Sequence, residues 1–269
     1  KLKPELEKEA QEMLILWEAK DKETMTLWKK MNSWALNGFK ESFKTFGIFH
    51  DKTYFESEIY DKGKEIILEG VKNKIFSQEK EGGVFVDLEK EGLGKKYLLR
   101  SDGTSIYITQ DIYLAKKKFE DFKVDKSVYV VGNEQDHYFK TFFAVLDKLK
   151  IINKNNLFHL SYRMVNLPEG RMKSREGTVV DADDLIEDVK KLVKKELRKR
   201  AKLKPKVLEE KSLKIALAAI KYMLLKVDIK KDMIFNPKES ISFEGDTGPY
   251  LLYSYARASS ILKKIKISF

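Results

Sequence analysis

A short run of cations in the middle of the chain has the residue types best suited to chemistry. The residues Arg171-Met-Lys-Ser-Arg175 follow an apolar run, Leu160 to Leu167, and the turn residues Pro168 and Gly170. Cationic side chains and free backbone N–H groups in such a loop can neutralise charge on phosphoryl oxygens. The stretch therefore predicts a polyphosphate site, and its alternative is an ordinary basic surface loop, which is the commoner use of this composition.

A second candidate is the pair Tyr107 and Asp111, four residues apart where a short apolar run gives way to a predicted helix. If the turn between them is helical, the two side chains share one face. A carboxylate can accept two parallel N–H bonds from a guanidinium group, and an aromatic ring can stack on its plane. The alternative for Asp111 is a helix N-cap, which the residues alone favour because Asp is common there.

A third candidate, Gln135, follows the apolar run Ser127 to Val131, which reads as a strand buried on both faces of a parallel sheet. Ligands of open α/β sheets bind in the crevice just beyond such strands. The Gln135 amide can both donate and accept toward an amino or carboxylate group. His137, two residues on, is expected either to cap the helix or to face a nucleotide, and a lone histidine at a helix start is more often structural.

The elements that must position these residues follow from periodicity and turn residues. We expect helices over 6–47, with Gly38 and Gly47 interrupting or closing them, and over 61–74, 111–122 and 137–150. We expect a hairpin or a tight turn between the runs 97–100 and 105–108, and strands over 84–87, 127–131 and 157–165. We expect helices beyond Asp183, including an apolar one over 213–225 and a last one from Thr247. Strands that alternate with helices of this length predict a doubly wound α/β layer.

The composition limits the class of protein. The chain has 269 residues, no cysteine and a formal net charge of +11. The length is enough for a core, and the lack of cysteine excludes disulfides and thiolate metal sites. No apolar run approaches membrane-spanning length, so we expect a cytosolic protein that makes no membrane contact. The charge predicts a polyanionic partner; the basic segment Lys190 to Lys206 is either a solvated helix face or an RNA-facing patch.

Four longer stretches occur in order: Arg100 to Asp111, Tyr129 to His137, Met164 to Arg175, and Phe243 to Tyr250. Together they resemble arginyl-tRNA synthetase, a class I aminoacyl-tRNA synthetase, over nearly the whole chain. The resemblance implies an α/β fold, a partial Rossmann-like parallel sheet with mainly helical N-terminal and C-terminal segments. It also implies an arginine-tRNA ligase that uses L-arginine, ATP with Mg²⁺, and tRNA(Arg).

The resemblance assigns roles to particular residues. It places arginine recognition at Tyr107, Asp111 and Gln135. The ATP contacts that it implies are His137, Met164, Val165, Arg171, Met172, Lys173, Ser174 and Arg175. The signature loop departs from the family pattern, because Ser174 stands where a second lysine is expected. The tRNA contacts expected from the basic segments are Lys194, Lys195, Arg198 and Arg257, and no metal ligand is expected in the protein.

The resemblance also suggests how the chain is divided. We expect a mainly helical insertion over 1–95, the second half of the Rossmann-like domain over 96–190, a helical stem over 191–245, and the start of an anticodon-binding domain over 246–269. Class I synthetases carry an early His-x-Gly-His-type signature that holds the phosphates of ATP. None of the three histidines of this chain lies in such a signature. We therefore expect a portion of the enzyme that lacks the N-terminal half and is inactive alone. The alternatives are a non-catalytic basic tRNA-binding fragment and a synthetase-related protein.

Overall fold

The structure, a computed structural model, falls into two compact units. The first comprises Lys1–Asp51 and Asp181–Glu187, and the second comprises Lys52–Val180 and Asp188–Phe269. The division into four segments expected from the sequence stays a prediction. The residues that the structure describes are 4–59, 62–166 and 181–265.

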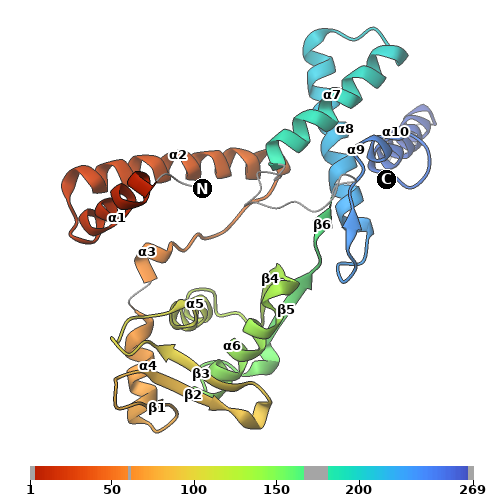
Figure 1. The fold of residues 1–269 in the computed structure, drawn as a ribbon. Helices are drawn as coiled ribbons and strands as arrows, with labels where there is room; N and C mark the ends of the chain where they lie inside the picture. Colours follow the sequence, from red (N-terminus) through yellow and green to blue (C-terminus); the bar gives the residue numbers. More distant parts are fainter. Residues whose placement is uncertain (1–3, 60–61, 167–180, 266–269) are drawn as a thin grey trace. The chain divides into compact units, whose positions relative to one another are not determined.

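A helical hairpin makes up most of the first unit (Figure 1). It consists of α1 (Pro4–Glu18) and α2 (Lys22–Phe46), so the expected helical period is confirmed. The Asp21 carboxylate accepts a main-chain N–H and starts α2, and Gly47 ends it at a φ of 68°. The predicted interruption at Gly38 is wrong: a glycine inside a helix costs only about 1 kcal/mol, and α2 continues through it.

The second unit begins with a small antiparallel sheet. Its strands are β1 (Ser77–Gln78), β2 (Val84–Leu88) and β3 (Gly94–Leu99), in the order β1-β2-β3. The short elements around it are α3 (Glu56–Ile59), α4 (Gly63–Lys72) and the 3-10 turn η1 (Glu89–Glu91). Val84, Val86 and Leu98 are fully or almost fully buried and contribute to one continuous apolar core. This core anchors the elements that follow.

Helix α5 (Tyr107–Phe122) begins four residues earlier than the sequence predicted. Before it, the Gly103 N–H donates to the Arg100 carbonyl at 2.9 Å, and Ser105 makes a single bridge to Leu99. Of the two predicted alternatives the tight turn is therefore confirmed, and the second strand of a hairpin is wrong. The Thr109 hydroxyl accepts the Ile106 N–H at 3.2 Å, which caps the first turn of the helix. Asp111 therefore lies inside α5, and the alternative that it is the N-cap is wrong.

A parallel strand pair follows α5. The strands β4 (Ser127–Gly132) and β5 (Leu157–Tyr162) pair in parallel register along their whole length, as the sequence predicted. The elements between them are η2 (Asn133–Gln135), α6 (Asp136–Lys148) and η3 (Lys154–Asn156). Tyr129 and Val131 pack against the core. Val128 and Val130 are 56% and 61% exposed, so the prediction that this strand is buried on both faces is wrong for the residues described.

The expected strand over 157–165 is divided. After β5 the chain turns, and β6 (Val165–Asn166) pairs in parallel with β7 (Met233–Ile234), a strand far along the sequence. The backbone N–H of Arg163 donates to the Ile229 carbonyl at 2.8 Å. A partner strand distant in sequence, which local periodicity cannot reveal, therefore sets where this extended segment divides.

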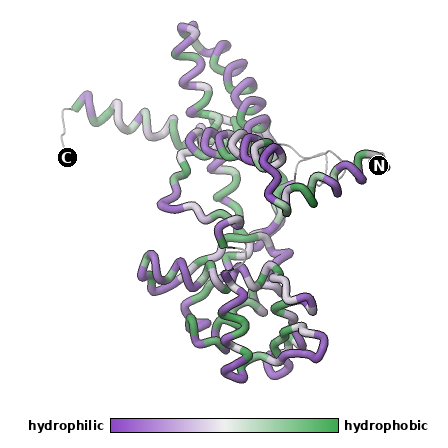
Figure 2. Tube along the Cα trace, turned by 90° about the vertical axis from the view of Figure 1, so that its left-hand side faces the viewer, coloured by the Kyte–Doolittle hydropathy of each residue, from purple (hydrophilic) through white to green (hydrophobic). Residues whose placement is uncertain are grey.

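The remaining elements are helical, as predicted. They are α7 (Ala182–Arg200), α8 (Pro205–Lys226), α9 (Pro237–Ser240) and α10 (Gly248–Lys264). The α8 and α10 helices cross closely at Gly248, which has no Cβ. A Cβ at this position would overlap the Ala218 carbonyl. Hydrophobic and hydrophilic residues are mixed along α10 (Figure 2). Among the helices of the described residues, none is both long and apolar enough to span a bilayer.

Candidate functional site

Tyr107 and Asp111 lie one turn apart on α5, as the sequence required. Tyr107 is the first residue of the helix and is 78% exposed. Asp111 is half-buried and belongs to the next turn. The core positions Ile108, Ile112 and Ala115 hold the adjoining part of the helix surface in the apolar cluster, which is why Asp111 is partly shielded. The helix therefore presents a free phenol ring one turn from a partly shielded carboxylate.

Among the described residues the Asp111 carboxylate has one direct partner, which sequence reasoning missed. The Tyr138 hydroxyl, on α6, donates a hydrogen bond to Asp111 Oδ2. Within the described residues, the Asp111 carboxylate accepts no main-chain N–H and has no cation within ion-pairing distance. Burial raises the pKa of Asp111, while the Tyr138 hydrogen bond and the charge of Lys118 act in the opposite direction. The arrangement is a shielded carboxylate whose second oxygen is available to a ligand.

Three further titratable groups surround this carboxylate. Lys118 lies two turns after Asp111 on α5, and its ammonium nitrogen is 5.3 Å from the centroid of the Tyr129 ring. Burial lowers the pKa of Lys118 and raises that of Tyr129. The charge of Glu56, on α3, raises the pKa of Asp111 further. Of these neighbours of Asp111, only Lys118 could be expected from the sequence. It lies seven residues after Asp111, and this separation places both side chains on one side of a helix.

Gln135 and His137 lie at the start of α6. Gln135 is the exposed N-cap position, directly after β4 and η2, in the predicted crevice position at the carboxyl end of a parallel strand. Tyr138 lies one turn after Gln135 on α6, and its hydroxyl bonds to Asp111 on α5. The recognition candidates Gln135 and Asp111 therefore come from two helices that pack against each other. His137 is exposed. The more buried histidine is His159, which sequence reasoning left without a role.

His159 connects β5 to the start of α6. Its ring stacks on Phe139 with centroids 4.2 Å apart, and its Nε2 lies 3.0 Å from the Val131 carbonyl oxygen. Its Nδ1 lies 3.4 Å from a carboxylate oxygen of Asp136. These contacts fix the first turn of α6 on the parallel strands.

The predicted ATP contacts are only partly within the described residues. Met164 is 41% exposed, and its carbonyl accepts the Met233 N–H at 3.2 Å. Val165 is the half-buried first residue of β6. The signature-loop residues lie outside the described residues: Arg171, Met172, Lys173, Ser174 and Arg175. The ATP assignments stay predictions.

The predicted tRNA contacts differ in their exposure and in their bonds to other residues of the protein. Lys194, on α7, pairs with Glu209 of α8 and has a side chain only 24% exposed. Lys195 and Arg198 are exposed on the same helix. Arg257, on α10, donates to the Tyr253 hydroxyl at 3.0 Å, with its guanidinium carbon 5.5 Å from that ring's centroid. The exposed cations are the ones available to a polyanion.

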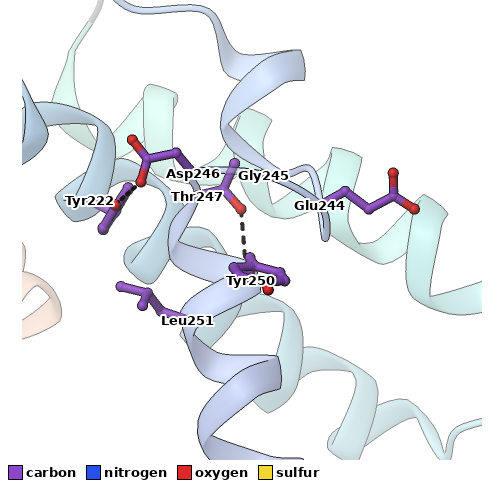
Figure 3. Close-up of a pocket in the computed structure, with 7 residues that line it drawn as sticks. All are labelled: Tyr222, Glu244, Gly245, Asp246, Thr247, Tyr250 and Leu251. Atoms are coloured by element: carbon purple, nitrogen blue, oxygen red, sulfur yellow. Dashed lines mark hydrogen bonds between the residues drawn. The ribbon is translucent and has the colours of Figure 1, made fainter.

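A hollow at the α8–α10 crossing has a structural explanation (Figure 3). The Tyr222 hydroxyl donates to the Asp246 carboxylate, and the Thr247 hydroxyl caps α10 by accepting the Tyr250 N–H at 3.2 Å. Gly245 has a φ of 76°, which favours glycine, whereas Gly248 is required because α10 approaches the Ala218 carbonyl closely. The lining residues are Tyr222, Glu244, Gly245, Asp246, Thr247, Tyr250 and Leu251. None of the predicted arginine-recognition residues is among them.

Comparison with models of protein families shows to which family the fold and the four motifs belong. The model of the family described as tRNA synthetases class I (R), catalytic domain, matches residues 3–237. The chain belongs to the arginyl-tRNA synthetase family. The resemblance inferred from the four sequence motifs is thereby confirmed, as is the α/β class.

Curated relatives in the arginyl-tRNA synthetase family are close in sequence. The chain is 53% identical over 263 residues to an arginine–tRNA ligase of Treponema denticola and 50% identical over 262 residues to one of Bacteroides thetaiotaomicron. These alignments cover 96% of the chain in both cases. The chain spans 44% of the length of each relative.

Solved structures of arginyl-tRNA synthetases share the fold. The Plasmodium falciparum enzyme matches with a TM-score of 0.79 at 22% identity, over 98% of this chain and 45% of that one. The Thermus thermophilus enzyme matches with a TM-score of 0.78 at 24% identity, over 99% of this chain and 51% of that one. The expected class I synthetase architecture is confirmed.

Proposed function

We propose that this chain is the amino-acid-recognising portion of an arginine-tRNA ligase. The observation that carries the proposal is the Asp111 carboxylate: it is half-buried, held by one neutral phenol, and has no cation within ion-pairing distance among the described residues. A shielded carboxylate suits a planar cation that donates two parallel N–H bonds, because Oδ1 has no bond among the described residues and Oδ2 keeps a second lone pair beside the Tyr138 bond. Arginine is the amino acid whose side chain is that cation.

In this proposal each recognition residue has a separate task. Asp111 pairs with the guanidinium group, the exposed Tyr107 ring one turn earlier stacks on it, and the Gln135 amide binds the amino or carboxylate end. The reaction joins the arginine carboxylate to the α-phosphoryl group of ATP with release of pyrophosphate, and the terminal hydroxyl of tRNA(Arg) then takes the arginyl group with release of AMP. Catalysis is mainly positioning and charge stabilisation, for which Arg171, Lys173 and Arg175 are the proposed phosphate contacts, with Met172 and Ser174 beside them.

Mg²⁺ is proposed to arrive with the nucleotide. Within the described part of the chain, no group of three His, Cys, Asp or Glu side chains could hold a metal ion. A cation bound by the phosphates of ATP needs no such cluster. When bound, it supplies charge neutralisation at the phosphoryl oxygens, beside the contacts proposed at His137, Met164 and Val165.

Isothermal titration calorimetry with L-arginine tests the proposal. The wild-type chain is expected to bind arginine, and Asp111→Asn is expected to bind about 30-fold more weakly or worse, because a shielded ion pair loses one partner. Citrulline, which replaces the guanidinium by a neutral group, should not bind the wild-type chain. The matched control is Asp125→Asn, at an exposed carboxylate in the turn before β4. Equal arginine binding by both variants would contradict the proposal.

Activity of the 269-residue chain alone is a separate question. Because the chain spans 44% of its curated relatives' length, we expect it to bind arginine without catalysing ATP–pyrophosphate exchange. Arginine-dependent exchange at a rate typical of intact enzymes would overturn this expectation and would mean that the 269-residue chain suffices for activation.

The alternative function is tRNA binding without arginine recognition. It is favoured by the exposed cations Lys195 and Arg198 on α7 and by the net charge of +11. It predicts salt-sensitive tRNA affinity, and each cation lost should lower the slope against log salt by about 1. Lys195→Gln and Arg198→Gln should weaken binding more than Lys194→Gln, because Lys194 is already paired with Glu209. If arginine also binds, both activities belong to the ligase; tRNA binding alone supports the alternative.

A further inference from the structure

Tyr138 links the two helices that carry the candidate site. Its hydroxyl donates to Asp111 Oδ2 from the first turn of α6, one turn after Gln135. Its ring is held by two neighbours: the Phe139 ring at a centroid distance of 5.4 Å and an angle of 87°, and the Phe142 ring at 6.0 Å and 14°. The phenol is therefore fixed before any ligand arrives.

A neutral donor at this position has a particular effect on the carboxylate. A lysine or arginine bonded to Asp111 would cancel the charge that a cationic ligand needs, whereas a phenol leaves the charge in place. A hydrogen bond to Oδ2 also restricts rotation of the carboxylate about its side-chain bond. Because bidentate pairing requires both oxygens in one plane with the guanidinium, this restriction lowers the cost of ordering the site when the ligand binds.

We propose that Tyr138 is a positioning residue for arginine recognition: its hydroxyl holds Asp111 Oδ2 and presents the carboxylate edge to the guanidinium group. This inference rests on the proposed function, since it assumes that Asp111 is the guanidinium partner. It couples α5 to α6, so that a shift of the Gln135 turn also shifts the carboxylate.

The variant Tyr138→Phe isolates this hydroxyl. Phenylalanine keeps the ring and its contacts with Phe139 and Phe142, so the fold should be retained, which circular dichroism checks. Arginine affinity is expected to fall about 10-fold by calorimetry, the size expected for one hydrogen bond to a charged group. The matched control is Tyr222→Phe, which removes a phenol hydroxyl that also donates to an aspartate, Asp246, in the hollow at the α8–α10 crossing, where no arginine-recognition candidate lies. Its arginine affinity should stay within about 2-fold of wild type.

The pH dependence of binding distinguishes positioning of the carboxylate from a purely structural role. Arginine binds the ionised carboxylate, so affinity declines as the pH falls through the pKa of Asp111. The groups that face this carboxylate are Lys118 on α5, Glu56 on α3, Tyr129 on β4 and Tyr138 on α6. The Tyr138 hydrogen bond lowers the pKa of Asp111, so its loss should move the acid limb of binding to higher pH. A purely structural role would reduce affinity by the same factor at every pH.

The outcomes separate the two proposals. If wild-type protein does not bind arginine, or if Asp111→Asn binds it normally, the proposed function fails and Tyr138 fails with it. If Asp111→Asn loses arginine but Tyr138→Phe matches Tyr222→Phe in affinity and in acid limb, the role of Tyr138 is overturned while the proposed function stands. A 10-fold loss with a shifted acid limb in Tyr138→Phe supports both.

Discussion

Large apolar side chains are buried in the region around α5 and α6, here called the body, and are largely exposed in the hairpin of α1 and α2. In the body, aromatic residues such as Phe142 are 1% exposed and pack among other rings. None of the α2 residues, all of which are described, is buried, and Phe39 is 57% exposed. The difference shows which part of the protein can hold side chains in fixed positions. The recognition candidates lie on helices fixed by a core, while the hairpin is held mainly by its own helical bonds and caps.

The largest expected effect comes from truncating the core. Phe142→Ala should lower the free energy of unfolding by about 3–5 kcal/mol, because the removed ring leaves a cavity among Tyr129, Tyr138 and Phe139. Urea unfolding followed by circular dichroism measures the change. A loss below about 1 kcal/mol would mean that this body can collapse around the deletion, and the contrast with the hairpin would disappear.

A smaller loss is expected from a single added methyl group in the same body. Gly63→Ala places a Cβ against the Thr109 carbonyl, where α4 meets α5, so it should destabilise the protein by about 1–3 kcal/mol. The thermal midpoint checks the direction. An unchanged midpoint would show that α4 moves away from α5 without penalty, and arginine affinity measured on the same variant would show whether Asp111 moves with it.

The same substitution in the hairpin should act in the opposite direction. At Gly38 no atom lies within 4 Å of an added Cβ, and the residue is in the interior of α2. Gly38→Ala should therefore raise the free energy of unfolding of the hairpin by about 0.5–1 kcal/mol through helix propensity. Urea titration of the helical signal measures it; a loss of stability would reveal a contact on this face that the described residues do not provide.

The smallest effect is expected for the counterpart of the core truncation. Phe39→Ala removes the same side chain as Phe142→Ala, but from an exposed position on α2. The free energy of unfolding should change by less than about 0.5 kcal/mol. A loss comparable to that of Phe142→Ala would show that the hairpin buries this face in solution, which would end the contrast between the two regions.

Local patterns predicted the elements well where one period dominates. The helices of the hairpin, the parallel strands β4 and β5, and the late helices all follow from spacing of apolar residues. The start of α5 was misplaced because Ser105 to Ile108 has the alternation of a strand, while the deciding contact is the Thr109 side chain on the Ile106 N–H. The exposure of Val130 was also mispredicted, since sequence composition does not tell which face of a strand other elements cover.

The candidate site was predictable in part for a similar reason. Tyr107 and Asp111 share a helix, so their spacing alone placed them one turn apart. Tyr138 could not be found this way, because its contact with Asp111 depends on how α5 and α6 pack. Its position three residues after Gln135 gave a weak signal, one helical turn from a predicted ligand contact. Partners that come from a second helix require the tertiary structure.

The placement of the indole side chains has a practical consequence. All three tryptophans of the chain, Trp17, Trp28 and Trp34, lie on α1 and α2, and the first two form an edge-to-face pair with centroids 5.7 Å apart. Emission excited at the red edge of protein absorption therefore originates in the hairpin alone, while tyrosine reports elsewhere. A change in that emission on adding arginine would mean that occupancy of the amino-acid site is communicated to the hairpin, and the protein needs no added dye to reveal it.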